Sequence, residues 1–170
     1  MRAWKNGSHR RRRHLRRERR EGKKRASRLN PTIEKFGYPA TLVREYEHWL
    51  VLLRPAQVTL GSLILAAKSE VTAFGALPVD AFAEQALAIA AIERSLGEFC
   101  SYEKINYLML MMVDPNVHFH VIPRYQGSRA WNGKEFSDAG WPGPPQLGSS
   151  IALEPEEIAR MTSELSIIFR

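Results

Sequence analysis

The chain has 170 residues, of which 44% are hydrophobic, and this length and composition suit one folded domain with a tail. No apolar run approaches the 18 or so residues that a membrane helix needs, and the basic amino-terminal run is not followed by the apolar run of a secretory signal. Cys100 is the only cysteine, which excludes an intrachain disulfide and a thiolate metal cage, so we expect a soluble protein of a reducing compartment, the cytoplasm.

The net charge of +7 is distributed unevenly. Residues 1–28 contain 14 of the 25 Lys and Arg residues but two of the 18 Asp and Glu residues, a net charge of +12, which leaves −5 for the remainder. A block of like charge with few apolar side chains cannot offset the entropy of ordering, so we predict that residues 1–30 form a disordered tail. Such a tail could bind RNA or another polyanion nonspecifically, or it could take no part in the chemistry.

The first part of the body, which begins near residue 31, reads as strands. Residues 41–46 and 48–54 are apolar or alternating, with β-branched and aromatic side chains, and residues 61–68 look similar. A helix of about 20 residues follows within residues 77–100, because apolar side chains recur there every seven residues. We expect Asp80 to cap this helix.

The second part of the body adds two strands and a helix. Residues 104–113 are apolar on both faces, which favours a central strand covered on both sides, and residues 117–125 return antiparallel to it after a compact turn. Residues 126–150 are rich in Gly, Pro and Ser and predict an irregular surface segment. Residues 154–169 predict a final helix, with Pro155 in its first turn. The chain therefore predicts an α+β domain over residues 31–170, an antiparallel sheet with one long helix across a face.

Two histidines mark the last strand. In a strand, residues i and i+2 share a face, so Asn116, His118 and His120 point one way and the residues between them point into the core. The two imidazoles then lie about 7 Å apart along the chain. One neutral ring could attack an electrophile while its protonated neighbour binds an anion.

Two other interpretations of the pair stay open from the residues alone. Both histidines could be solvated side chains on a surface strand. They could also chelate a metal, but a metal site needs a third and a fourth ligand. Outside the tail the sequence offers only His48 as a further histidine and shows no clustering of acidic residues, so we expect no metal.

Residues 104–125, KINYLMLMMVDPNVHFHVIPRY, resemble the signature region of the histidine-triad (HIT) superfamily. There the pattern is His-φ-His-φ-His-φ-φ, often followed by Pro-Arg, with Lys-φ-Asn at the start of the preceding strand. Residues 60–70 resemble the family's earlier strand, and the long helix falls between the two regions, as in the family. The resemblance covers residues 41–125 and implies a HIT-like sheet of about five strands.

The resemblance implies a nucleotide hydrolase or transferase that needs no cofactor. Members of the family cleave at the α-phosphate of a nucleotide, as in dinucleoside polyphosphates and nucleoside phosphoramidates. His118 falls on the middle histidine, which attacks phosphorus to form a covalent nucleotidyl-histidine that water then resolves. His120 falls on the third histidine, which would contact the non-bridging phosphate oxygens. The resemblance also implies a homodimer, paired through the long helix and an adjacent strand.

The sequence departs from the family pattern at several positions. Asn116 stands in place of the first histidine, and Ser62 stands where the family often has a histidine after glycine. We interpret both changes as altering substrate choice or leaving-group protonation, because the nucleophile is retained. Met111 and Met112 replace a Gly-Asn pair of some members.

A set of polar residues completes the predicted nucleotide- and phosphate-binding site. Asn106 matches the family's asparagine on the neighbouring strand, Arg124 could neutralise phosphate, and Arg54 aligns with a position that contacts ribose. Asn116 and Ser62 belong to the same predicted set. Trp131 and Trp141 could stack on a base or simply anchor their own loop.

One alternative function stays open. The chain could be a non-catalytic nucleotide- or nucleic-acid-binding protein in which the Arg-rich tail dominates. This hypothesis predicts tight, strongly salt-dependent binding of RNA or DNA that is lost when residues 1–30 are deleted.

Overall fold

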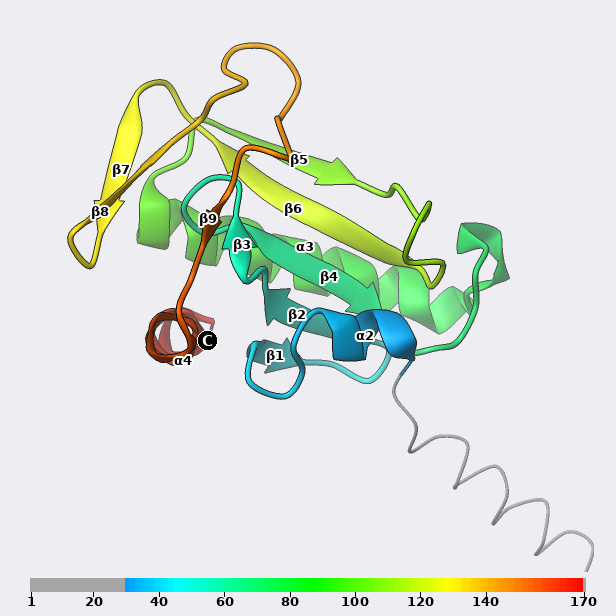
Figure 1. The fold of residues 1–170 in the computed structure, drawn as a ribbon. Coiled ribbons are helices and arrows are strands. Elements are labelled where there is room, and N and C mark those ends of the chain that lie inside the picture. Colours follow the sequence, from blue (N-terminus) through cyan, green and yellow to red (C-terminus); the bar gives the residue numbers. More distant parts are fainter. Residues whose placement is uncertain (1–29, 170) are drawn as a thin grey trace, which may run out of the picture.

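The computed structural model describes residues 30–169, and its centre is a five-stranded antiparallel sheet in the order β1-β2-β4-β6-β5 (Figure 1). The strands of this sheet are β1 (Leu42–Glu45), β2 (Trp49–Leu53), β4 (Leu63–Ala67), β5 (Lys104–Leu108) and β6 (His118–Arg124). The α+β class, the antiparallel sheet and the antiparallel pairing of the last two strands are thereby confirmed.

Helices cover both faces of the sheet. Figure 1 shows α3 behind the sheet and the short α2 in front of it, with α4 beside β1 and β2. The helices are α2 (Pro31–Lys35), α3 (Val79–Cys100) and α4 (Pro155–Ile168), with a 3-10 turn η1 (Phe74–Ala76) before α3. The predicted long helix and the predicted final helix are both confirmed.

The larger core lies between the back of the sheet and the two longer helices. Alternate residues of each strand point to this side, and they meet apolar side chains of α3 and α4. Fully buried contributors are Trp49, Val51, Leu53, Leu63, Leu65, Val121, Ala88, Ile92, Leu96, Met161 and Leu165. Burial of this much apolar surface is the main stabilising term of the fold.

The smaller core lies on the front face, under α2. Leu50, Leu52 and Ile64 pack there against Ile33 and Phe36 of the α2 segment. The helix begins as capping rules require, because the Asn30 side chain accepts a hydrogen bond from the backbone N–H of Ile33 at 3.1 Å and a proline follows at the first position. With five residues, α2 is too short to give a periodic signal, and the sequence does not predict it.

The predicted central strand over residues 104–113 is wrong. β5 ends at Leu108 and is an edge strand, and the residues that follow form an exposed loop in which Met112 is 88% and Val113 81% exposed. Apolar composition alone does not distinguish a doubly covered strand from an apolar loop.

Two smaller predictions are also wrong. Residues 126–150 are not wholly irregular, because β7 (Ser128–Trp131) and β8 (Lys134–Ser137) form a hairpin. Asp80 does not cap α3, because the helix begins at Val79 after Pro78 without a side-chain cap. Asp80 instead lies in the first turn, where negative charge favours the helix dipole.

Two further short strands form a separate two-stranded sheet. β3 (Ala56–Gln57) pairs with β9 (Ile151–Ala152), and α4 follows directly. No helix within residues 30–169 is long and apolar enough to cross a membrane. The predicted tail spans residues 1–30, and all of it except Asn30 lies outside the described residues.

Candidate functional site

Both histidines of β6 lie on the front face of the sheet. In the register with β4, His120 is opposite Ile64 and His118 is opposite Ala66, two members of the smaller core. The ring centroids are 5.1 Å apart and the ring planes meet at 73°. The shared face that the alternation predicts is therefore confirmed, and the two rings can address one small group.

A backbone hydrogen bond fixes which nitrogen of His118 carries its proton. Nδ1 of His118 lies 2.8 Å from the backbone carbonyl oxygen of Asn116. A carbonyl oxygen can only accept, so Nδ1 must be the donor, which assigns the tautomer. In the neutral ring, Nε2 then carries the lone pair. This tautomer is the one that a nucleophilic histidine needs.

The two imidazoles are enclosed by the α2 segment. His118 is 1% and His120 9% exposed, and the Phe36 ring lies over both, with centroid distances of 5.5 and 5.7 Å. The pair is therefore not a set of solvated side chains on an open strand.

His120 is held neutral near physiological pH. Burial is the main cause that lowers the pKa of His120 to about 4, and the neighbouring His118 and Arg54 lower it further against a weaker opposing effect of Asp114. Its Nδ1 is buried and has no hydrogen-bond partner among the described residues. The sequence led us to expect a protonated imidazole beside the neutral one, but His120 is neutral in the free protein. A bound anion would favour protonation of His120.

This lowered pKa predicts a loss of stability in mild acid. The unfolded chain binds the proton near pH 6.5 and the folded protein near pH 4, so stability is full above pH 6.5 and falls as the pH drops from 6.5 to 4. The loss attributable to His120 is about 3 kcal/mol. Urea unfolding at pH 7 and pH 4.5 should show a smaller difference for His120→Gln than for the parent protein. An identical difference in both proteins would contradict the assignment.

The guanidinium of Arg124 is fully engaged by neighbouring protein groups. Its guanidinium donates to both carboxylate oxygens of Asp138, at 2.6 and 3.1 Å, and its side chain is 5% exposed. It also donates to the side-chain oxygen of Asn106 at 2.7 Å and to the carbonyl of Gly143 at 2.9 Å. The structure therefore uses Arg124 and Asn106 to hold the segment around residues 138–143 on the edge of the sheet.

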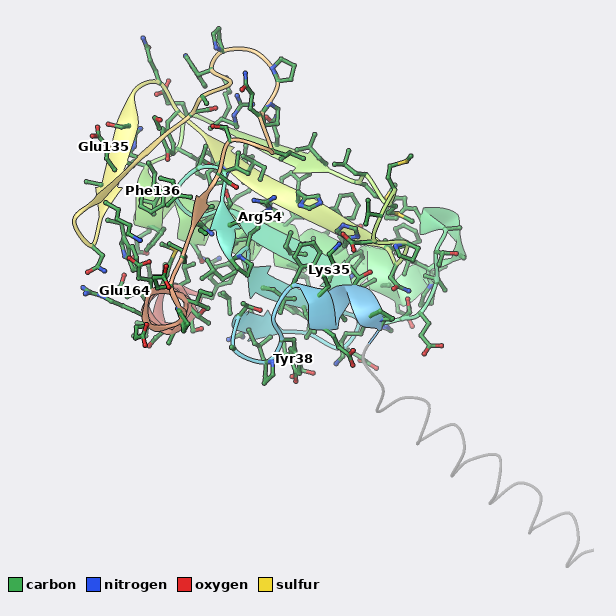
Figure 2. The ribbon with its side chains drawn as sticks, viewed as in Figure 1. Lys35, Tyr38, Arg54, Glu135, Phe136 and Glu164 are labelled. Atoms are coloured by element: carbon green, nitrogen blue, oxygen red, sulfur yellow. The ribbon has the colours of Figure 1, made fainter. Side chains whose placement is uncertain are left out.

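Arg54 keeps its charge available on the histidine face. It follows β2 in register with Ser62, and Figure 2 shows it on the side of the sheet where α2 and Lys35 lie. Its guanidinium donates to the carbonyl oxygen of Ala56, its Nε is buried without a partner, and no carboxylate of residues 30–169 forms an ion pair with it. Burial lowers the pKa of Arg54. A phosphate beside His120 would supply the missing negative partner.

Within the part of the chain that the structure describes, no group of three or more His, Cys, Asp or Glu side chains is placed to hold a metal ion.

Comparisons with known proteins identify the architecture. No family model and no curated protein matches the sequence. Among solved structures, a histidine triad protein from Bradyrhizobium japonicum matches with a TM-score of 0.63 and 19% identity, over 84% of this chain and 98% of that one. A histidine triad protein from Sinorhizobium meliloti matches with a TM-score of 0.64 and 21% identity, over 81% and 93%. A hypothetical histidine triad nucleotide-binding protein from Sulfolobus tokodaii gives 0.56 and 17%, over 81% and 89%.

The chain has the histidine-triad fold. The resemblance found in residues 41–125 is thus confirmed at the level of the fold, and the match extends over most of the described domain.

Asn116 links three segments of the chain. Its side-chain oxygen accepts from the Thr32 hydroxyl at 3.1 Å, and its side-chain nitrogen donates to the carbonyl of Glu70 at 3.0 Å. The amide is buried, and its backbone carbonyl orients His118. Asn116 therefore anchors α2 beside His118.

Ser62 occupies the inside of a turn between β3 and β4. Its hydroxyl donates to the carbonyl of Thr59 at 2.7 Å and accepts from the N–H of Thr59 at 3.1 Å. The buried side chain of Gln57 receives the N–H groups of Gly61 and Ser62, both at 2.9 Å. Gly61 has a φ of +86°, and a side chain there would also press on Leu96 of α3. The structure thus uses Ser62 to shape the turn that precedes β4.

Sequence reasoning missed two residues that contact predicted site residues: Phe36, beside the two histidines, and Asp138, beside Arg124. Phe36 lies outside every predicted element, and its role depends on how α2 folds over the sheet. Asp138 lies in a segment predicted to be irregular, and nothing in the sequence pairs it with Arg124. Two features of the sequence could have pointed to them. An Asn-Pro pair marks the start of α2, and Arg124 has no acidic residue close to it along the sequence.

Proposed function

We propose that the chain is a nucleotide hydrolase or transferase that cleaves at the α-phosphate through a covalent intermediate on His118. The observation that carries this proposal is the 2.8 Å hydrogen bond from Nδ1 of His118 to the carbonyl of Asn116, which leaves Nε2 as a nucleophile beside His120. The fold supports it, since one structure of the same fold is described as a histidine triad nucleotide-binding protein.

The reaction has two displacements. In the first, the lone pair of Nε2 of His118 forms a bond to the α-phosphorus, and the bond from phosphorus to the leaving group breaks with its electron pair. In the second, water attacks the same phosphorus, the phosphorus–nitrogen bond breaks, and a nucleoside monophosphate is released with a proton going to solvent. Nδ1 keeps its proton against the carbonyl of Asn116 throughout, which stabilises the positive charge of the substituted ring.

Charge on the phosphate is met by His120 and Arg54. His120 is neutral in the free protein, so it donates one hydrogen bond to a non-bridging oxygen, and the bound anion raises its pKa. Arg54 lies near enough to His120 to lower that pKa, and its guanidinium lacks an acidic partner within the described residues. Both groups are in place before binding, as preorganised stabilisation of developing charge requires.

Phe36 packs against both imidazoles, at centroid distances of 5.5 and 5.7 Å, and bounds the site on the side of α2. Exclusion of water from the site by this ring would protect the covalent intermediate.

The proposed state of the protein is a cytoplasmic homodimer. β5 is an edge strand, and α3 exposes apolar side chains, with Val79 82% and Leu87 67% exposed. Exposed apolar side chains and an unpaired strand edge favour pairing with a second copy. The single Cys100 is buried and reduced, which suits the cytoplasm.

The test is product chromatography after incubation with diadenosine tetraphosphate, diadenosine triphosphate and adenosine 5′-phosphoramidate. Release of AMP from at least one substrate is the expected result. Binding of all three without release of AMP would favour the non-catalytic alternative.

A further inference from the structure

The loop that follows β5 carries a patch of apolar side chains. Residues 109–113, MLMMV, form this apolar loop, and four of its side chains are exposed to solvent: Met109, Leu110, Met112 and Val113. The five side chains carry no charge and no N–H or O–H donor. Apolar side chains that are gathered on one loop, rather than scattered singly over the surface, indicate a surface that a partner covers.

Met111 holds the apolar loop in this conformation. Its side chain is partly buried and packs against the larger core, whereas its neighbours on both sides are exposed. Its φ of +49° lies in the left-handed region, which a residue with a side chain adopts at a cost unless its surroundings require it. The loop is therefore anchored at its middle residue and displays its other side chains before any partner arrives.

The basic segment, residues 1–28, joins the domain beside the apolar loop. The side-chain nitrogen of Asn30 donates to two backbone carbonyls at the end of β4 and just beyond it, at 2.8 and 2.9 Å. Lys35 of α2 forms an ion pair at 2.6 Å with Asp114, the residue that directly follows the apolar loop. Figure 1 shows α2 and the loop after β5 at the same end of the sheet. A segment with a net charge of +12 thus meets the domain next to the exposed apolar side chains.

The rest of the chain would repel an anionic surface, so any attraction must come from the basic segment. Residues 29–170 have a net charge of −5, and exposed Glu70 lies near the apolar loop, its carbonyl bonded to Asn116. A small apolar anchor alone gives marginal, reversible attachment to a membrane, and a polybasic stretch is the kind of second signal that makes attachment stable. This chain supplies both signals side by side.

We propose that the apolar loop and the basic segment together bind the surface of an anionic phospholipid bilayer. The apolar loop inserts at the boundary between headgroups and acyl chains, and the Lys and Arg side chains of residues 1–28 contact lipid phosphates. Insertion this shallow leaves water to satisfy the N–H and C=O groups of the loop backbone. A bilayer suits a loop without polar side chains better than a protein partner does, because protein interfaces pair polar groups at their rim. The binding is independent of the proposed hydrolase activity.

The first test is sedimentation of the full chain with vesicles of phosphatidylcholine, alone or mixed with phosphatidylglycerol. The protein should sediment with the mixed vesicles, and less so as the salt concentration rises. Met112→Ser combined with Val113→Ser should lower the partition coefficient about tenfold, the order expected when two apolar side chains no longer enter the bilayer. The control is Ile167→Ser, which replaces an exposed apolar side chain of α4 and should leave the coefficient unchanged.

A charge variant of the full chain tests the electrostatic half of the proposal. Replacing Arg10, Arg11, Arg12 and Arg13 together by glutamine should lower partitioning into the mixed vesicles at least about tenfold, because each basic side chain near an anionic surface contributes to the attraction. Loss of binding in this variant with parental binding in the Met112→Ser, Val113→Ser variant would reduce the contact to charge alone and overturn the role of the apolar loop.

A fluorescent label on the apolar loop distinguishes a membrane from other partners. An environment-sensitive dye is attached at Met112→Cys, and Cys100 does not compete because it is buried and its pKa is raised to about 12 by that burial. The emission should shift to the blue with mixed vesicles and stay unchanged with RNA. Binding of RNA without binding of vesicles would assign the basic segment to nucleic acid and overturn the proposal. A changed oligomeric state in the Met112→Ser, Val113→Ser variant, with parental vesicle binding, would assign the loop to a contact between copies and would also overturn it.

Discussion

Replacing His118 by alanine should lower kcat for AMP release by about a thousandfold or more, because no second group in the site is prepared to attack phosphorus. The tautomer of His118 is fixed by the carbonyl of Asn116, whereas Nδ1 of His120 has no partner among the described residues. Loss of the nucleophile removes the covalent route, and the remaining groups can only bind the phosphate. Steady-state assays with the best of the three proposed substrates measure the effect.

The control for this variant is His48→Ala, which removes a histidine from the turn between β1 and β2, away from β6. His48→Ala should keep the parental kcat. Circular dichroism and thermal unfolding should show that His118→Ala protein is folded, since alanine leaves a gap beneath Phe36 but no unpaired charge. A folded His118→Ala protein with parental turnover would exclude His118 as the nucleophile.

Replacing Asp138 by alanine should lower the free energy of unfolding by about 3–5 kcal/mol, the usual cost of leaving one partner of a buried ion pair alone. Arg124 and Asp138 are 5% and 1% exposed at their side chains, so water cannot replace the lost carboxylate. The hydrogen bond to the N–H of Gly140 is lost in the same change. Urea unfolding at pH 7 measures the difference.

Two further variants test whether the unpaired buried charge of Arg124 causes the loss of stability in Asp138→Ala. Asp138→Ala combined with Arg124→Met should recover part of the lost stability, because neither charge is then buried unpaired. Glu45→Ala breaks an exposed ion pair with Lys68 and should cost no more than about 1 kcal/mol. Equal losses for Asp138→Ala and Glu45→Ala would mean that the Arg124–Asp138 pair contributes no more than a surface contact.

The periodicity of apolar residues predicted a strand correctly where neighbouring strands of the sheet pair with it. Alternation over residues 117–125 correctly separated the histidine face from the core face, because β6 is bordered by strands on both sides. The same reasoning failed for residues 109–113, where apolar side chains are exposed in a loop. Whether an apolar run is covered depends on which distant segment covers it, and periodicity does not contain that information.

The candidate site shows the same difference between what one segment supplies and what distant segments supply. The histidine pair could be predicted because two residues of one strand supply it. The surroundings of Asn116, Ser62 and Arg124 could not, because their partners are Thr32, Thr59 and Asp138, which the fold brings from other segments. Arg124 and Arg54 look equivalent as isolated cations, yet only Arg124 has a buried carboxylate against it.

The most direct test of the central claim, attack by His118 to form a covalent intermediate, is the stereochemical course at phosphorus. A substrate carrying sulfur in one configuration at the α-phosphate is hydrolysed in isotopically labelled water, and the configuration of the released thiophosphate is determined. Two successive displacements, the first by His118 and the second by water, predict retention of configuration. Inversion would show that water attacks phosphorus directly and would contradict a nucleotidyl-histidine on this chain.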